Sequence, residues 1–96
     1  MNTFATDKEF QSSLRDALSK IVGLAQEYPE DAFIQSIHRQ LLAVSGWIES
    51  GSHPSNEQLG KLSFGVMASR AVDELDPELA HMLYRLANHL DAQRQQ

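Results

Sequence analysis

Apolar residues that recur at three- and four-residue steps are the feature that most limits the folds open to this chain of 96 residues. That spacing places side chains on one side of an α-helix, and no segment keeps the two-residue alternation of a β-strand for long enough to compete. The sequence therefore predicts an all-α fold. The cleanest stripe consists of Phe33, Ile34, Ile37, Leu41, Val44 and Ile48.

Start and stop signals divide the chain into helical segments. Pro29 disfavours helical geometry at the residue before it, and Gly51 is placed to end a helix. Three helix starts carry capping signals, namely Thr6 with Glu9, Ser55 with Gln58, and Asp76 followed by Pro77 and Glu78. We expect a single helical domain over residues 1–96, a small antiparallel bundle of about four helices. The expected helices span about 6–28, 30–50, 56–75 and 77–93.

The expected third helix, residues 56–75, has an unusual apolar surface. Its main stripe is Leu62, Gly65, Val66, Ala68, Ser69, Val72 and Leu75. Gly65 in a helix interior costs roughly 0.5–1 kcal/mol relative to Ala, which suggests a close neighbour at that point. Phe64, Met67 and Ala71 lie off the stripe. Either this helix is central in the bundle, or Phe64 and Met67 belong to a partner-binding patch.

Charge and composition favour a protein partner over a polyanion. The formal net charge is −5, with 13 acidic against 8 basic residues, which argues against nucleic acid and anionic membrane as partners. A partner with a basic surface suits such a chain better. The chain has no cysteine, and its beginning lacks the basic and apolar regions of a secretory signal. We therefore expect a cytoplasmic protein without a disulfide or thiolate zinc site.

No residue pattern indicates catalysis, a metal or another cofactor. His81 and His89 are eight residues apart, ~12 Å along a helix, too far to clasp one ion as an i, i+4 pair does. Carboxylates are paired at Glu30 and Asp31, but a glycosidase-type pair needs a cleft that four short helices seldom supply. We expect no enzymatic activity.

The acidic residues Asp73 and Glu74 have no obvious structural role, unlike Asp76 and Glu78 at a helix start. They fall in the last turn of the expected helix 56–75, where the negative helix end disfavours a carboxylate by roughly 0.3–1 kcal/mol. Arg70 offers a local partner, although such a pair contributes only ~0.2–0.5 kcal/mol. The alternative is a surface that docks against basic groups of another protein. The residues alone leave both interpretations open.

The run Leu62-x-x-Gly65-x-x-Ala68-x-Arg70-x-x-x-Glu74-x-Asp76-Pro77-Glu78-Leu79 resembles the second half of a known family. These are the small helical immunity proteins that neutralise NAD(P)-hydrolysing toxins delivered by type VI secretion. The resemblance implies a cytoplasmic, non-catalytic inhibitor that covers the active site of one cognate toxin. It also carries over Arg70, Glu74, Asp76 and Glu78 as positions of the family motif.

Two functions from different classes follow. The first is an immunity protein whose partner-binding residues are Phe64, Met67, Arg70, Asp73, Glu74, Asp76 and Glu78. The second is a self-associating helical bundle, a homodimeric scaffold or regulatory adaptor that uses the apolar surface of residues 56–75. A toxin-like reading frame immediately upstream of the gene would favour the first.

Overall fold

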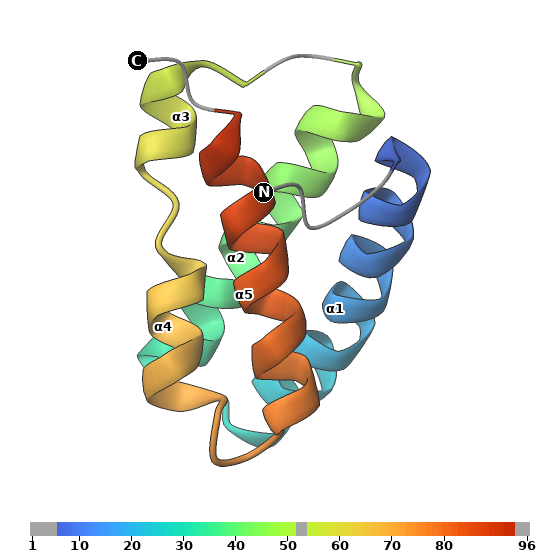
Figure 1. The fold of residues 1–96 in the computed structure, drawn as a ribbon. Coiled ribbons are helices and arrows are strands. Elements are labelled where there is room, and N and C mark those ends of the chain that lie inside the picture. The colour runs from blue at the N-terminus through green and yellow to red at the C-terminus, as the bar shows by residue number, and fades with distance from the viewer. Residues whose placement is uncertain (1–5, 52–53, 94–96) are drawn as a thin grey trace.

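The computed structural model describes residues 6–51 and 54–93, and these form helices without a β-strand (Figure 1). The expected all-α fold is therefore confirmed. The helices are α1 (Asp7–Glu27), α2 (Ala32–Glu49), α3 (Asn56–Gly60), α4 (Phe64–Ala71) and α5 (Pro77–Ala92).

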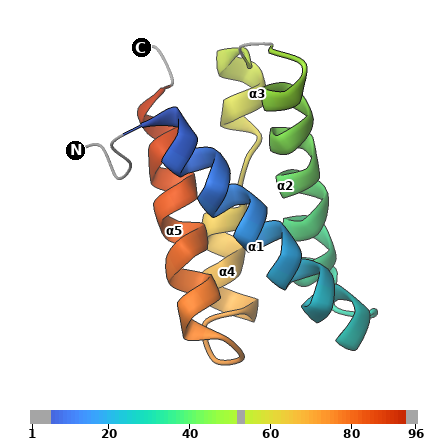
Figure 2. The same cartoon turned by 90° about the vertical axis from the view of Figure 1, so that its right-hand side faces the viewer.

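Four of these helices form an antiparallel bundle, and the short α3 closes one end of it. Helix α1 packs on α2 and α5, and α4 packs on the same two helices, so each of these four helices packs on two of the others. Figures 1 and 2 show that the chain reverses direction from α1 to α2, from α2 to α4 and from α4 to α5. As a result, the α1–α2 turn and the α4–α5 turn lie at the same end of the bundle.

The capping signals in the sequence work as expected at three helix starts. Thr6 accepts a hydrogen bond from the backbone N–H of Glu9 at 3.1 Å, and Asp76 accepts one from Leu79 at 3.1 Å. Ser55 and Gln58 form a complete capping box. Since each cap satisfies a backbone donor that the helix leaves free, these local residues determine where α1, α3 and α5 begin.

Helix α2 begins slightly later than the expected 30–50. Asp31 caps this helix, with its Oδ1 3.1 Å from the backbone nitrogen of Ile34, and the first helical residue is Ala32. Glu30 lies in the preceding turn. At the other end of α2, Gly51 adopts φ +72°, the left-handed conformation that glycine tolerates best. Residues 52 and 53 of the expected loop Ser50–Pro54 lie outside the described residues.

The prediction of a single helix over 56–75 is wrong. The structure has two helices in this range, α3 and α4, joined by residues 61–63. The physical reason is a long-range contact with Gln40 on α2. Its Oε1 accepts the backbone N–H of Ser63 at 2.7 Å, and its Nε2 donates to the Ser63 hydroxyl at 3.2 Å. A side chain from another helix thus takes the donor that a continuous helix would use, and α4 begins afresh at Phe64.

The break also changes which side of α4 faces the core. Phe64 is 1% exposed and Ala68 is fully buried, whereas Val66, placed on the expected core stripe, is 62% exposed. Met67 and Ala71 are half-buried and pack against the core. The apolar residues that seemed to lie off the stripe therefore belong to the core. The interruption at residues 61–63 makes α4 a separate helix, so a stripe drawn through the whole of 56–75 does not give the side of α4 that faces the core.

Candidate functional site

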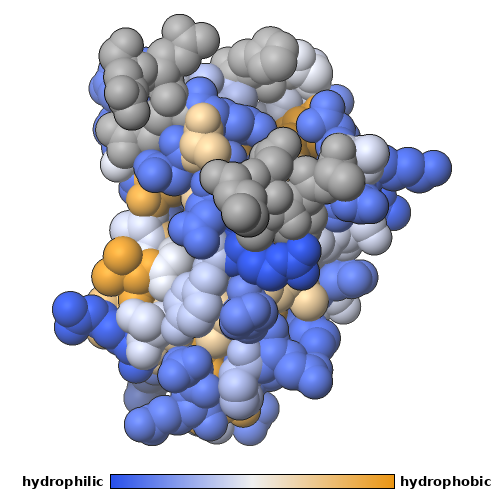
Figure 3. Space-filling model, in the orientation of Figure 1, coloured by the Kyte–Doolittle hydropathy of each residue, from blue (hydrophilic) through white to orange (hydrophobic). Residues whose placement is uncertain are grey.

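Two of the predicted partner-binding residues face inward. Phe64 is among the largest fully buried side chains, and this corrects its assignment as a contact residue. Met67 is half-buried, and its sulfur lies 3.6 Å from Nε2 of Gln40. The apolar side chain that α4 presents to solvent is instead Val66, and Figure 3 shows an apolar area over the outer side of this helix. Sequence reasoning missed Val66 because it assumed one continuous helical phase.

The predicted polar residues Arg70, Asp73 and Glu74 are all exposed. Arg70 lies in the last turn of α4, while both acids lie in the turn that follows the helix. Burial raises the pKa of Tyr84 on α5, and the negative charge of Asp73 raises it further. Asp73 is therefore close enough to act on the neighbouring helix electrostatically. Within residues 6–51 and 54–93, Asp73 and Glu74 form no hydrogen bond or ion pair through their side chains.

Asp76 and Glu78 have structural roles. Asp76 is half-buried and its carboxylate is engaged as the N-cap of α5. Glu78 lies 3.9 Å from Nζ of Lys20 on α1, but its side chain is 88% exposed, so this pair contributes little to stability. Glu78 thus remains accessible, whereas Asp76 shapes the turn.

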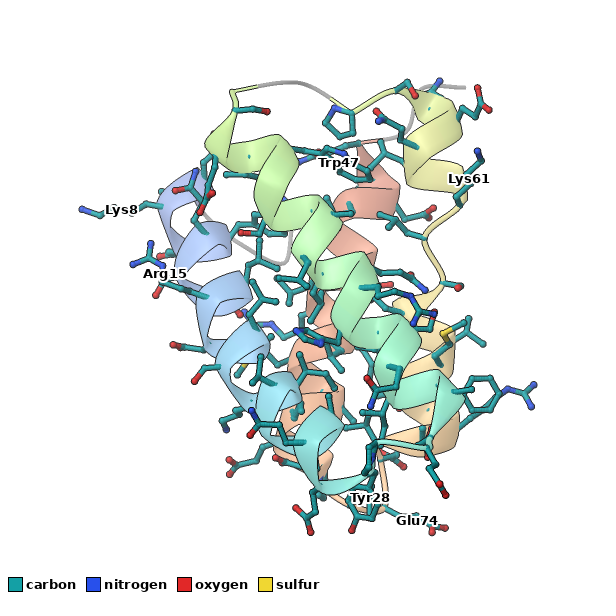
Figure 4. The ribbon with its side chains drawn as sticks, turned by 180° about the vertical axis from the view of Figure 1, so that it is seen from behind. Lys8, Arg15, Tyr28, Trp47, Lys61 and Glu74 are labelled. Atoms are coloured by element: carbon teal, nitrogen blue, oxygen red, sulfur yellow. The ribbon has the colours of Figure 1, made fainter. Side chains whose placement is uncertain are left out.

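The α1–α2 turn adds carboxylates that the sequence interpretation did not assign to this surface. Glu27 and Glu30 are exposed, and Asp31 caps α2. Gln35 holds the turn in place, because its Nε2 donates to the backbone oxygens of Ala25 at 2.9 Å and of Tyr28 at 3.2 Å. Figure 4 shows Tyr28 of this turn and Glu74 of the α4–α5 turn at the same end of the bundle. The signal in the sequence was the acidic pair Glu30–Asp31 after Pro29.

We define the acidic end as residues 27–33 and 70–78. It holds seven carboxylates and one basic side chain, Arg70, a formal charge of −6, whereas the whole chain carries −5. The rest of the molecule is therefore close to neutral. Its carboxylates are Glu27, Glu30, Asp31, Asp73, Glu74, Asp76 and Glu78. Such a concentration attracts cationic surfaces and accelerates their association.

Two large apolar side chains are exposed at this acidic end. Phe33, in the first turn of α2, is 43% exposed, and Leu75, in the α4–α5 turn, is 44% exposed. Among the described residues, only Leu42 and Val66 are comparable exposed large hydrophobics. Apolar anchors within a polar surround are typical of protein interfaces.

A groove runs between α4 and α5, with a volume of about 440 Å³. Gly65 and Ala87 line it where the helices approach closely, and Val66 and Tyr84 lie on its sides. The close approach expected at Gly65 is therefore present.

At the other end of the bundle, His89 is buried, with 7% of its surface exposed. Its ring stacks on Phe10 of α1, with centroids 4.5 Å apart, and its Nε2 lies 3.1 Å from Nε2 of Gln93. Burial lowers the pKa of His89, and the negative charge of Asp7 partly opposes this effect. In the described part of the chain, no three metal-ligating side chains come together. None of the described helices combines the length and apolarity that a membrane span requires.

Comparison with protein families identifies a match over most of the chain. The model of the Tsi6 family, a family of type VI secretion immunity proteins, matches residues 9–93. This match covers α1 from its third residue onward, α2 to α5, and both turns of the acidic end. No curated protein and no solved structure matches.

Proposed function

This chain belongs to the Tsi6 family of type VI secretion immunity proteins, and we propose that it binds one cognate NAD(P)-hydrolysing toxin and occludes its active site. Family membership supports a toxin as the partner. The resemblance of residues 62–79 to immunity proteins against such toxins supports the finer assignment. The protein acts without catalysis, in the cytoplasm, where NAD(P) would otherwise be consumed.

The observation that carries this proposal is the match over residues 9–93, together with the exposed acidic surface in that range. The exposed carboxylates of Asp73, Glu74 and Glu78 are available to contact a basic toxin surface, and Arg70 is exposed beside them for an acidic or polar group of the toxin. Asp76 contributes by fixing the turn. Complementary charge of this kind speeds association and sets the register of the two proteins.

A self-associating scaffold is the second candidate function. Exposed Val66 beside the groove between α4 and α5 favours it, because an apolar area of this kind can be covered by a second copy. Sedimentation measurements of the purified protein distinguish the two. A concentration-independent monomer contradicts the scaffold and leaves the immunity function in place.

The immunity function is tested by searching immediately upstream of this gene for a toxin-like reading frame and expressing the toxin domain that it encodes. Expression of that toxin domain alone should deplete cellular NAD(P) and stop growth, and co-expression of this chain should restore both. A chain carrying Ile37→Asp, a substitution in the fully buried core, serves as the unfolded control. The proposal fails if the wild-type chain is expressed and folded but neither binds the toxin domain nor preserves NAD(P).

A further inference from the structure

The exposed apolar residues of the acidic end are the starting point. Phe33 follows the capped start of α2 directly, next to Ile34, which is fully buried. Leu75 lies in the α4–α5 turn, beside the capping residue Asp76. The side chains of Phe33 and Leu75 are each more than two-fifths exposed, although the residue next to each of them, Ile34 and Asp76, is held in place by the fold. A complex in which a partner buries this apolar area is stabilised, because the area is removed from water.

The charge around these two residues identifies the chemistry of that partner. Residues 27–33 and 70–78 carry a formal −6, more than the net charge of the whole protein. A partner that covers Phe33 and Leu75 must therefore place cationic groups opposite the surrounding carboxylates, because like charges would oppose binding. Charge complementarity excludes a second copy docked through the same end.

Six of the seven carboxylates of the acidic end fall into two groups, and the seventh, Glu78, lies 3.9 Å from Nζ of Lys20. Asp31 and Asp76 cap α2 and α5, so their oxygens are engaged. Glu27, Glu30, Asp73 and Glu74 are exposed, and within the described residues their side chains form no hydrogen bond or ion pair. Four carboxylates are thus available to an incoming cationic surface.

The backbone that carries the four available carboxylates is already held in place in the free protein. The caps and the two hydrogen bonds from Gln35 hold both turns before any partner arrives. A surface that needs little ordering on binding loses less conformational entropy. The acidic end is therefore presented in two preformed turns on adjacent parts of the bundle (Figures 1 and 4).

NAD(P) itself suggests where such a surface would dock. The dinucleotide carries a pyrophosphate, and an enzyme binds phosphates with cationic side chains or oriented backbone N–H groups. The substrate cleft of an NAD(P)-hydrolysing toxin must therefore attract anions. This step rests on the function proposed above.

We infer that the acidic end of the bundle enters the phosphate-binding part of the toxin's substrate cleft, with Phe33 and Leu75 as apolar anchors. The carboxylates of Glu27, Glu30, Asp73 and Glu74 take the place of the substrate phosphates. Occlusion of the active site is then direct competition for the groups that bind NAD(P).

The first test neutralises the available carboxylates without changing their shape. The variant Glu27→Gln/Glu30→Gln/Asp73→Asn/Glu74→Gln should raise the Kd for the purified toxin domain at least about tenfold, through faster dissociation as well as slower association, because carboxylates seated in the cleft lose their pairing with buried cationic groups. A smaller variant, Asp73→Asn/Glu74→Gln, has a matched control in Asp16→Asn/Glu49→Gln, which removes one Asp and one Glu from exposed positions elsewhere. The control should change Kd less than about twofold. Circular dichroism establishes that all variants remain folded.

The second test asks whether the chain and the substrate phosphates exclude each other. ADP carries the pyrophosphate but no nicotinamide bond, and adenosine lacks the phosphates. At ten times the inhibition constant of ADP for NAD hydrolysis, ADP should raise the Kd of the chain for the toxin by about tenfold, as one-site competition requires. Adenosine at the same concentration should have little effect. Phe33→Ser/Leu75→Ser should also weaken binding, mainly through faster dissociation.

The outcomes separate this inference from the proposed function. If the chain binds and inhibits the toxin but the acidic-end variants behave like the Asp16/Glu49 control, the inference is wrong and the immunity function stands. The same holds if ADP inhibits the toxin yet leaves the Kd of the chain unchanged. If the wild-type chain does not bind the toxin at all, the proposed function itself is wrong.

Discussion

A Cβ atom at Gly65 of α4 would lie 2.8 Å from the Cβ of Ala87 on α5. Real Cβ atoms do not approach so closely, so the two helices pack at a distance that only glycine permits. Gly65 lowers the stability of an isolated helix by roughly 0.5–1 kcal/mol. The close packing of α4 on α5 offsets that cost.

The first prediction concerns this contact. Gly65→Ala should destabilise the protein despite the better helix propensity of alanine, and Gly65→Leu should cost about 1–3 kcal/mol, the range typical of overpacking. Gly23→Ala and Gly46→Ala are matched controls, because a Cβ there would meet nothing within 4 Å. Both controls should gain up to about 1 kcal/mol. Urea denaturation measures all four.

A compensating change makes this test specific. Ala87→Gly removes the atom that a Cβ at Gly65 would meet, so the double variant Gly65→Ala/Ala87→Gly should be more stable than the two single losses predict by addition. Simple additivity, or a stabilising Gly65→Ala, would show that α4 and α5 are free to separate at this point.

The second prediction concerns Gln40, which joins α2 to the start of α4. Its amide bonds the backbone N–H and the hydroxyl of Ser63 and lies 3.1 Å from the hydroxyl of Ser36. Gln40→Leu leaves the Ser63 N–H without this acceptor and should cost about 1–3 kcal/mol in unfolding free energy. The control Gln26→Leu, at an exposed site, should stay within about 0.5 kcal/mol. Equal stability of the two variants would argue against Gln40 as the residue that holds α4.

Local signals in the sequence predicted much of this fold. The apolar stripes predicted the positions of α1, α2 and α5, because the helical period of each stripe runs unbroken. Thr6, Ser55 and Asp76 marked three helix starts, because each side chain bonds the backbone of a residue three positions away. The break at residues 61–63 could not be predicted in this way. The break depends on Gln40, which lies 23 residues before Ser63 in the sequence. Capping and periodicity rules consider only nearby residues, so they cannot predict such a contact.

The candidate site was predicted only in part for the same reason. Asp73 and Glu74 stood out because of their position relative to a helix end, a local property. Glu27 and Glu30 join them only because the bundle folds the α1–α2 turn to the same end (Figure 4). Phe64 was misassigned because its exposure depends on the phase of α4, which the break resets.

The third prediction concerns His89, whose burial lowers its pKa below the usual 6.5 while Asp7 partly opposes this effect. Because the neutral form is favoured in the folded state, the unfolded chain binds more protons between the folded pKa and 6.5. Stability from this group is complete above pH 6.5 and is lost as the pH falls through the folded pKa. The free energy of unfolding should therefore fall between pH 7 and 5.5, where carboxylates remain ionised.

Two variants test the assignment to His89. His89→Gln should flatten the fall in stability between pH 7 and 5.5, whereas His81→Gln, at an exposed position on the same helix, should leave it unchanged. Thermal denaturation at several pH values provides the comparison. If the slope persists in His89→Gln, another group is responsible for it.

The last prediction concerns reversal of charge at the acidic end. Asp73 and Glu74 follow the C-terminal turn of α4, where a positive side chain is favoured, so Asp73→Lys/Glu74→Lys should leave the protein folded and change its stability by no more than a few tenths of a kcal/mol. Toxin binding should weaken because Lys would face the basic groups of the toxin. The matched control Asp16→Lys/Glu49→Lys makes the same change of charge at exposed sites on α1 and α2.

Salt dependence then locates these two carboxylates within the interface. If they lie on the rim, the difference in affinity between wild type and Asp73→Lys/Glu74→Lys should be a few tenths of a kcal/mol and fade as ionic strength rises beyond about 0.15 M. If they are desolvated against toxin cations, the difference should be about 2 kcal/mol or more and persist in salt. Docking deep in a phosphate-binding cleft requires the second result. Full protection of cells by this variant, with unchanged affinity at low salt, would place the contact elsewhere, and the exposed Val66 beside the groove between α4 and α5 would be the next surface to mutate.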